Sequence, residues 1–262
     1  MKLPETITNN LGHLRYGVGS VRANVRRGDK IASRRADLQA VKKAIADLFP
    51  NCPKDFLQDG VVVRRDPLGK PYIEWHSAMA EWAEMQGIFA ENCHISNTSD
   101  GDWHLVFAVY YEHLAGVGVD AVWIPRMELK GKNRDYLLRF ARQFMSELEW
   151  SGFEPYTHGA TENVLRFGVM AHFSLMEAAS KACGTGLKIG LGMGRSTSLP
   201  MQSLGAAMII PVVHLLIEGE AILRFFELGV NDSEAYWGLE EDFIISLVLL
   251  YKNPVGTNEI GV

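Results

Sequence analysis

The chain has 262 residues, of which 47% are hydrophobic and 22% are charged, a composition typical of a soluble globular protein. Its formal net charge of −5 argues against a nucleic-acid-binding protein. Residues 1–142 nevertheless carry 20 Lys and Arg against 17 acidic residues, whereas residues 143–262 carry 6 against 14. We therefore expect a positive surface on the N-terminal half that meets an anionic partner, with a solvated face as the alternative.

The cysteines and the apolar runs indicate in which cellular compartment the protein is expected. The three cysteines are too scattered for a disulfide framework or a zinc site: Cys52, Cys93 and Cys183. They fit a reducing cytoplasm, where we expect this protein. The N-terminus lacks the apolar core of a signal peptide, and the most apolar run, Ala206–Ile217, is short and broken by Pro211. The sequence therefore predicts no membrane segment.

The first half of the chain alternates helical and extended patterns. Residues 1–30 show no clear period, so we expect an irregular lead-in. Apolar residues at helical spacing predict an amphipathic helix over residues 33–49. A hairpin-like unit follows, with extended pieces near 60–65 and 72–75 around the turn Asp66–Pro71.

The rest of the chain adds strands before long helices. In order, we expect a strand over 103–111, its sheet continued by 117–119, helices over 133–150 and 161–183, a glycine-rich loop over 184–194, and strand-like runs over 206–217, 221–228 and 242–251. Asp120 is expected at a strand end. This order predicts an α+β fold with helices against antiparallel sheets in two lobes, 1–125 and 126–262. No internal repeat is visible.

The stretch Phe173–Leu187 combines good helix formers with a glycine stop, which places Glu177 and Lys181 on one helix face. Such a pair could be a surface ion pair worth about 0.3 kcal/mol. The helix is otherwise largely apolar, however, and a carboxylate there needs a cation to hold it ionised. Either a metal ion or Lys181 could be that cation.

Common catalytic motifs are absent, because Gly190–Gly194 lacks the Lys-Ser/Thr ending of a phosphate loop and neither a nucleophile elbow nor a His-Glu-x-x-His pair occurs. The remaining candidates are two carboxylates and several cations: Asp120, Glu177, Lys181, Lys70 and the basic helix near Arg34. Acids that hold a hard cation and cations that hold phosphate oxygens are what magnesium-dependent pyrophosphate chemistry needs.

Four segments in the right order resemble the 4′-phosphopantetheinyl transferases, over most of the chain. Gly118–Asp120 resembles the Gly-Ile-Asp magnesium motif of that family. Phe173–Lys181 resembles its Trp/Phe-Ser-x-Lys-Glu-x-x-x-Lys motif and continues as in the small holo-carrier synthases. Arg142–Glu149 resembles the helix between these motifs, and Leu68–Pro71 the upstream Gly-Lys-Pro. The length is similar to that of the larger, single-chain type.

The resemblance implies a transferase that moves 4′-phosphopantetheine from coenzyme A to a serine of an acyl or peptidyl carrier protein and releases 3′,5′-ADP. It implies two pseudo-symmetric lobes, each a small antiparallel sheet packed with helices, and an active site between them. The expected partners are coenzyme A and the carrier protein, without nucleic acid or membrane, and the expected state is a cytoplasmic monomer. Acidic carrier helices would dock on the positive N-terminal part.

The resemblance also implies roles for single residues. Asp120 and Glu177 would bind Mg²⁺, and Glu177 or a water on the metal would take the proton of the carrier serine. Lys181, expected with Glu177 to be catalytic, and Lys70 would bind phosphate oxygens of coenzyme A. Arg34 or Arg35 would bind its 3′-phosphate, and Asn97 stands where the family often has a His that contacts coenzyme A.

Besides Asn97, two residues depart from the family pattern. Val122 stands where many larger members have a second metal-binding acid, and Met176 replaces a Lys that usually precedes the Glu. Either the lost Lys slows the chemistry, or Met176 packs into an apolar surround that suits it. The alternative function is a degenerate homologue that binds coenzyme A or a carrier protein without transfer.

Overall fold

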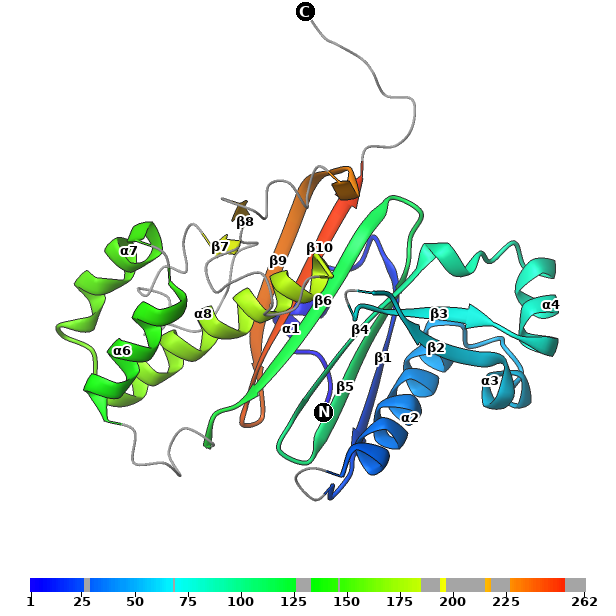
Figure 1. The fold of residues 1–262 in the computed structure, drawn as a ribbon, viewed down its shortest axis with the longest axis horizontal. Helices are drawn as coiled ribbons and strands as arrows, with labels where there is room; N and C mark the ends of the chain where they lie inside the picture. The colour runs from blue at the N-terminus through cyan, green and yellow to red at the C-terminus, as the bar shows by residue number, and fades with distance from the viewer. Residues whose placement is uncertain are drawn as a thin grey trace, which may run out of the picture.

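Strands lie at the centre of the molecule and helices lie across and beside them in the computed structural model (Figure 1). The structure describes residues 1–25, 29–67, 69–125, 133–145, 147–184, 194–196, 215–217 and 227–252. The elements before residue 125 are α1 (Glu5–Thr8), β1 (Arg15–Arg22), α2 (Lys30–Leu48), α3 (Lys54–Gly60), β2 (Val61–Arg65), β3 (Pro71–Trp75), α4 (Ser77–Met85), the 3₁₀ turn η1 (Ala90–Asn92), β4 (Cys93–Asp100), β5 (Trp103–Tyr110) and β6 (Leu114–Trp123). Those after it are α6 (Arg134–Phe144), α7 (Glu147–Thr157), α8 (Glu162–Ala182), β7 (Gly194–Ser196), β8 (Leu215–Ile217), β9 (Val230–Glu240) and β10 (Phe243–Lys252).

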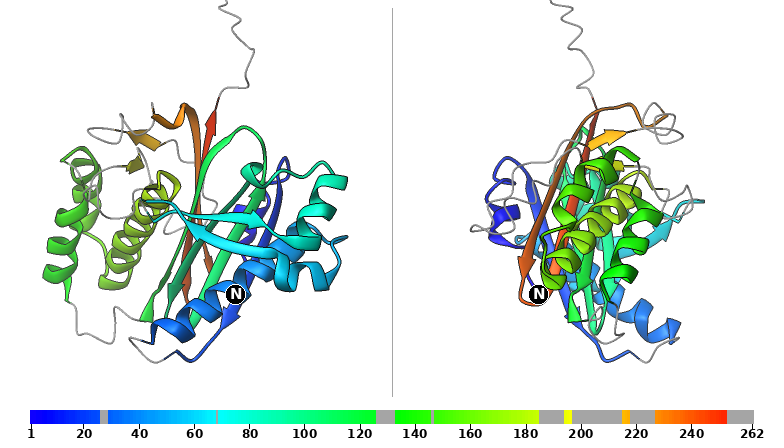
Figure 2. Two further views of the ribbon diagram at one scale, coloured as in Figure 1. Left: turned by 45° about the vertical axis from the view of Figure 1, so that its right-hand side comes forward. Right: turned by 90° about the vertical axis from the view of Figure 1, so that its left-hand side faces the viewer.

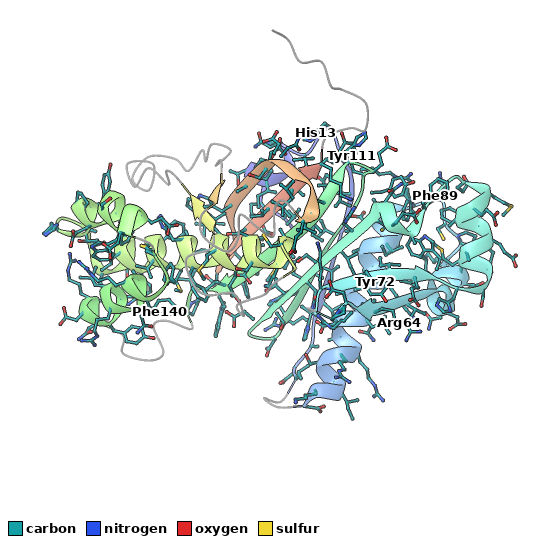
Figure 3. The ribbon with its side chains drawn as sticks, turned by 45° about the horizontal axis from the view of Figure 1, so that its top comes forward. His13, Arg64, Tyr72, Phe89, Tyr111 and Phe140 are labelled. Atoms are coloured by element: carbon teal, nitrogen blue, oxygen red, sulfur yellow. The ribbon has the colours of Figure 1, made fainter. Side chains whose placement is uncertain are left out.

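Two three-stranded antiparallel sheets form the centre, in the orders β1-β5-β4 and β6-β10-β9. Helices α6 and α7 lie at one end of the molecule and the hairpin β2–β3 with α3 and α4 at the other, so Phe140 and Tyr72 are far apart (Figures 1 and 3). This arrangement confirms the α+β prediction. The expectation that residues 117–119 continue the sheet of residues 103–111 is wrong, because β6 is hydrogen-bonded to β10.

The sheets meet where β4 lies beside β6 (Figure 2). Two side chains of β4 accept hydrogen bonds from backbone amides of β6 there. The Val119 amide donates to Ser96 Oγ at 2.9 Å, and the Trp123 amide donates to Asp100 Oδ2 at 2.9 Å. Because amides of β6 find their partners here, the two sheets are joined by hydrogen bonds as well as by apolar packing.

Helix α8 lies directly on the backbone of β6. A Cβ added to Gly116 would lie 2.1 Å from the Ala182 carbonyl oxygen, and one on Gly118 would lie 1.8 Å from that of Ala178. Real side chains never approach so closely, so glycine is required at both positions. The helix begins at the Thr161 cap, whose side chain accepts from the Val164 amide.

Helix α2 makes the same contact with β1. A Cβ on Gly17 would lie 2.1 Å from the Ala44 carbonyl oxygen, and one on Gly19 would lie 1.8 Å from that of Ala40. The first unit is therefore α2 with β1-β5-β4, and the second is α8 with β6-β10-β9. Two units built alike confirm the pseudo-symmetric arrangement that the family resemblance implies.

Four sequence-based expectations need comment. Residues 1–30 are not an irregular lead-in, because β1 belongs to a central sheet. The single helix expected over 133–150 is two helices, α6 and α7, with extended backbone at Met145 between them. Asp120 lies inside β6 rather than at a strand end. The runs 206–217 and 221–228 and the loop 184–194 lie mostly outside the described residues.

The division of the chain at residue 125 stays a prediction, although β6, which precedes it, pairs with a strand of the C-terminal half. The two sheets share a core that also buries Leu3, Ile7 and Leu11 of the N-terminal segment. Among the residues that the structure describes, no helix combines the length and apolar character needed to cross a bilayer.

The contact of β6 with α8 predicts a steep cost for one added methyl group. Gly118→Ala should lower the free energy of unfolding by about 1–3 kcal/mol, because the helix must move off the sheet. Gly152→Ala is the control, since nothing lies near its Cβ position in α7 and alanine should stabilise that helix by roughly 0.5–1 kcal/mol. Urea unfolding measures both, and equal stability of the two variants would contradict the contact.

Candidate active site

Asp120 is a buried carboxylate whose two oxygens differ. Its side chain is 2% exposed, and Oδ1 accepts from Lys181 Nζ at 2.7 Å and from Thr98 Oγ1 at 3.0 Å. Oδ2 is buried without a hydrogen-bond partner in the part of the chain that the structure describes. A buried oxygen with no partner is costly unless a cation or water meets it, so this atom marks a place for a ligand.

Lys181 links the helix to the strand that carries Asp120. Besides the ion pair, its ammonium donates to the Val119 carbonyl at 3.2 Å, and its side chain is 26% exposed. In the first unit, Lys43 donates in the same way to the Ser20 carbonyl at 3.1 Å. The contact of lysine with the main chain is thus common to both units, whereas the ion pair belongs to the second.

The register of α8 on β6 indicates where Glu177 lies relative to Asp120. Gly116 lies beside Ala182 and Gly118 beside Ala178, so two strand residues correspond to one helical turn. The next inward residue, Asp120, therefore lies beside the preceding turn, which contains the half-buried Glu177. This register predicts that the two expected metal ligands lie at one level of the fold, on facing elements.

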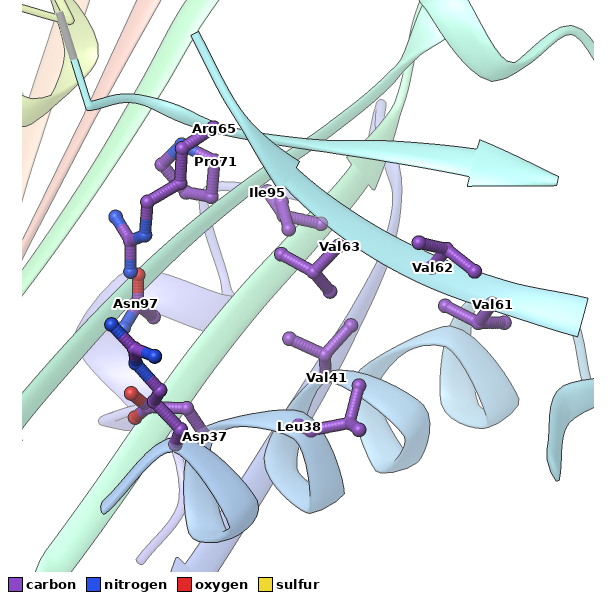
Figure 4. Close-up of a pocket in the computed structure, with 11 residues that line it drawn as sticks. Asp37, Leu38, Val41, Val61, Val62, Val63, Arg65, Pro71, Ile95 and Asn97 are labelled. Carbon is purple, nitrogen blue, oxygen red and sulfur yellow. The ribbon is translucent and has the colours of Figure 1, made fainter. Parts of the chain in front are cut away.

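A pocket of 480 Å³ lies between α2, β2, β3 and β4. Figure 4 shows Arg65, Asn97 and Asp37 toward one end and valines toward the other. Its full lining is Arg34, Asp37, Leu38, Val41, Val61, Val62, Val63, Arg65, Pro71, Ile95 and Asn97. Arginines beside an apolar wall suit a ligand that joins a phosphate to a flat, weakly polar ring.

The pocket and the carboxylate are linked through β4, whose consecutive side chains face opposite sides of the strand. Asn97 lines the pocket, and the next residue, Thr98, bonds to Asp120. Of the two expected arginines, Arg34 lines this pocket, whereas Arg35 lines a different hollow with Gln39. The structure therefore groups Arg34 with Asn97 and leaves Arg35 apart.

Lys70 is not among the residues that line the pocket. Its ammonium donates to the carbonyl oxygen of Ala182 at 3.0 Å and to that of Ala115 at 3.5 Å, at the C-terminal end of α8. A cation there interacts favourably with the negative end of the helix dipole, and its hydrogen bonds join the hairpin β2–β3 to the second unit.

His94 on β4 lies close to this region. Burial, then the charges of Lys70 and Lys252, lower the pKa of His94 to about 3, so this imidazole is neutral at pH 7.

The two residues of the second unit that depart from the family pattern are both buried. Met176 is 4% exposed and Val122 is 8% exposed, and both belong to the apolar core around α8. A lysine at position 176 would enter that core, which favours the interpretation that Met176 packs into an apolar surround.

The donor set fits a magnesium ion. No group of three or more His, Cys, Asp or Glu side chains that could hold a metal occurs in the described ranges. Magnesium commonly uses one or two carboxylates, with water and substrate phosphates as its other ligands. Asp120 with its orphaned oxygen and Glu177 on the facing helix meet that requirement.

The sequence reasoning missed three residues of this region, namely Thr98, Arg65 and Asp37. Asp37 Oδ1 contacts His104 Nδ1 at 2.8 Å, so two residues far apart in sequence meet at the pocket wall. No local pattern marks Asp37 or Arg65. Thr98 directly follows the expected site residue Asn97 in β4, but only the fold shows that its hydroxyl meets Asp120.

Breaking the ion pair should show how strongly Asp120 depends on Lys181. Lys181→Met should lower the free energy of unfolding by about 3 kcal/mol, because it leaves a buried charge. Adding Asp120→Asn should recover most of that loss. Lys43→Met, at the matching place in the first unit, is exposed and should cost no more than about 1 kcal/mol. Urea unfolding of the wild type and the three variants measures these changes. Equal losses of unfolding free energy for Lys181→Met and Lys43→Met would refute the dependence of Asp120 on Lys181.

Comparisons with known proteins identify the family of this chain. Residues 116–228 match the family model of the 4′-phosphopantetheinyl transferase superfamily. The chain is 35% identical over 139 residues to a holo-[acyl-carrier-protein] synthase of Photorhabdus laumondii, covering 53% of this chain and 98% of the relative. It is 30% identical over 137 residues to a holo-[acyl-carrier-protein] synthase of Salmonella newport, covering 52% and 97%.

Solved structures with similarity to this chain include the holo-ACP synthase of Plasmodium yoelii, with a TM-score of 0.42, 18% identity and coverage of 54% of this chain and 98% of that one. The Helicobacter pylori holo-[acyl-carrier-protein] synthase in complex with coenzyme A has a TM-score of 0.36, 19% identity and coverage of 51% and 98%. On the sequence matches, which span the relatives almost completely, the chain belongs to the 4′-phosphopantetheinyl transferase superfamily.

Proposed function

We propose that this protein transfers 4′-phosphopantetheine from coenzyme A to a serine of an acyl or peptidyl carrier protein and releases 3′,5′-ADP. The observation that carries the proposal is the buried Asp120, with one oxygen paired to Lys181 and one without a hydrogen-bond partner among the described residues, linked through β4 to a pocket with arginines. The names of the relatives, holo-[acyl-carrier-protein] synthases, support the same reaction.

Asp120 and Glu177 would hold a magnesium ion. When bound, magnesium supplies positive charge that neutralises the pyrophosphate of coenzyme A and the departing 3′,5′-ADP. Lys181 compensates the buried charge of Asp120 through the 2.7 Å ion pair. Its exposed fraction leaves room for a phosphate oxygen on the same ammonium.

The pocket would hold the nucleotide part of coenzyme A. Its apolar wall, which includes Val41 and Val63, offers a surface for the adenine ring. Arg34 and Asn97 offer donors to the 3′-phosphate and its surroundings, and Arg65 adds a second guanidinium. Lys70 would reach phosphate only by leaving the carbonyl oxygens at the end of α8.

The carrier serine would be deprotonated by Glu177, which lies level with Asp120 and is only half-buried. The positive N-terminal part would attract an acidic carrier protein. Because one chain contains both units that border the site, we propose that the protein is a monomer. We also propose that it works in the cytoplasm and that its two lobes are divided at residue 125.

Transfer should require both carboxylates. Asp120→Ala and Glu177→Ala should each abolish transfer, because one carboxylate alone holds a strongly hydrated cation poorly. The measurement is the mass of apo-carrier proteins incubated with coenzyme A and magnesium, which also separates an enzyme from a binding-only homologue. Glu84→Ala removes an exposed carboxylate on α4 and serves as the control. Full activity of either site variant would remove the metal assignment.

Nucleotide binding should depend on Arg34 more than on its neighbour. Arg34→Glu should raise the KM for coenzyme A about tenfold and leave kcat unchanged at saturation, because it removes a charged contact made in the ground state. Arg35→Glu makes the same charge change on the same helix but outside the pocket, so its effect should be small. Equal effects of both variants would mean that α2 acts only through its general charge.

A further inference from the structure

Thr98 contacts the active-site carboxylate from the other unit of the fold. It lies on β4 and is 6% exposed, and its hydroxyl donates to Asp120 Oδ1 at 3.0 Å. Asp120 lies on β6, so this hydrogen bond crosses between the two sheets. The neighbouring contact of Ser96 with the Val119 amide crosses at the same place.

The two donors to Oδ1 of Asp120 determine which carboxylate oxygen stays available to a ligand. Lys181 and Thr98 both donate to Oδ1, and they approach it from α8 and from β4. A carboxylate held on one oxygen from two directions has little freedom to rotate. Oδ2 therefore keeps a fixed position, and it is the oxygen without a partner in the described structure.

We infer that Thr98 is a positioning residue for the cation site, which orients Asp120 so that Oδ2 is presented to the metal. The inference rests on the proposed function for the identity of the metal. It assigns a task to a residue that touches neither metal nor substrate. Hydrogen bonds that orient metal-binding carboxylates commonly change metal affinity by about 10–100-fold when they are removed.

The competing explanation is that Thr98 only joins the sheets, as Ser96 does. Both residues lie on β4, both are buried, and both bond to β6. Removing either side chain should then lower thermal stability. Only a positioning role makes metal affinity depend on Thr98 and not on Ser96, so Ser96→Ala is the matched control.

The test is a titration of the full-length protein with Mn²⁺ at saturating coenzyme A, without carrier protein, followed by the electron paramagnetic resonance signal of free Mn²⁺. Thr98→Val, which keeps the shape but not the hydroxyl, should raise the dissociation constant at least tenfold. Thr98→Ser should restore the wild-type constant. Ser96→Ala should lower the melting temperature with an unchanged constant. If Thr98→Val does not fold, Thr98→Ala takes its place.

Each outcome decides between the ideas. Wild-type affinity in Thr98→Val or Thr98→Ala overturns the role of Thr98, and an Asp120→Ala protein that loses Mn²⁺ in the same experiment leaves the metal site standing. An equal rise of the Mn²⁺ dissociation constant in Ser96→Ala also overturns the role of Thr98, because any loosening of the contact between the two sheets would then weaken metal binding. A wild-type protein that binds no Mn²⁺ overturns both the metal site and the positioning role.

Discussion

The close contact between β6 and α8 is the constraint on which the active site depends. With no side chain at Gly118, the backbone of the helix near Ala178 lies against the strand. Only at this separation does the side chain of Lys181 reach both a main-chain carbonyl of β6 and the carboxylate of Asp120. A bulkier residue would move the helix outward, and the buried Asp120 would then lose the cation with which it is paired.

The repeated unit separates what the fold requires from what the chemistry requires. Gly17–Val21 in β1 corresponds to Gly116–Asp120 in β6, and Gln39–Ala44 in α2 corresponds to Glu177–Ala182 in α8. The glycines, alanines and lysine recur in both units, so packing and the contact of lysine with the main chain explain them. The acids do not recur, since valine and glutamine occupy their places in the first unit. Their presence in one unit only points to a function rather than to stability.

Much of the fold could be predicted from local patterns, because the helices 33–49 and 161–183 combine good helix formers with apolar residues on one side. The strands 103–111 and 242–251 are nearly continuous apolar runs, as expected for buried strands. The first strand was missed, because its glycines disguise the alternation of a strand while serving contact with α2. The same glycines hid the repeat, which short matching segments reveal only once the contacts are known. Contacts between distant segments, such as Thr98 with Asp120, follow from the tertiary arrangement and leave no local pattern.

The order of the strands explains why one chain holds one complete set of the groups around Asp120, namely Lys181 and the hydroxyl of Thr98. The two units follow each other head to tail, so the edge strand β4 of the first lies beside β6 of the second. The acid on β6 therefore receives a hydroxyl from the preceding unit. In the second unit the place of Thr98 is taken by Tyr236, whose hydroxyl donates to Glu234 instead. The family match begins at Gly116, and the relatives cover about half of this chain, so a single unit of that length would lack the preceding β4. Two units in one chain supply both sides of the site, which favours the monomer that we propose.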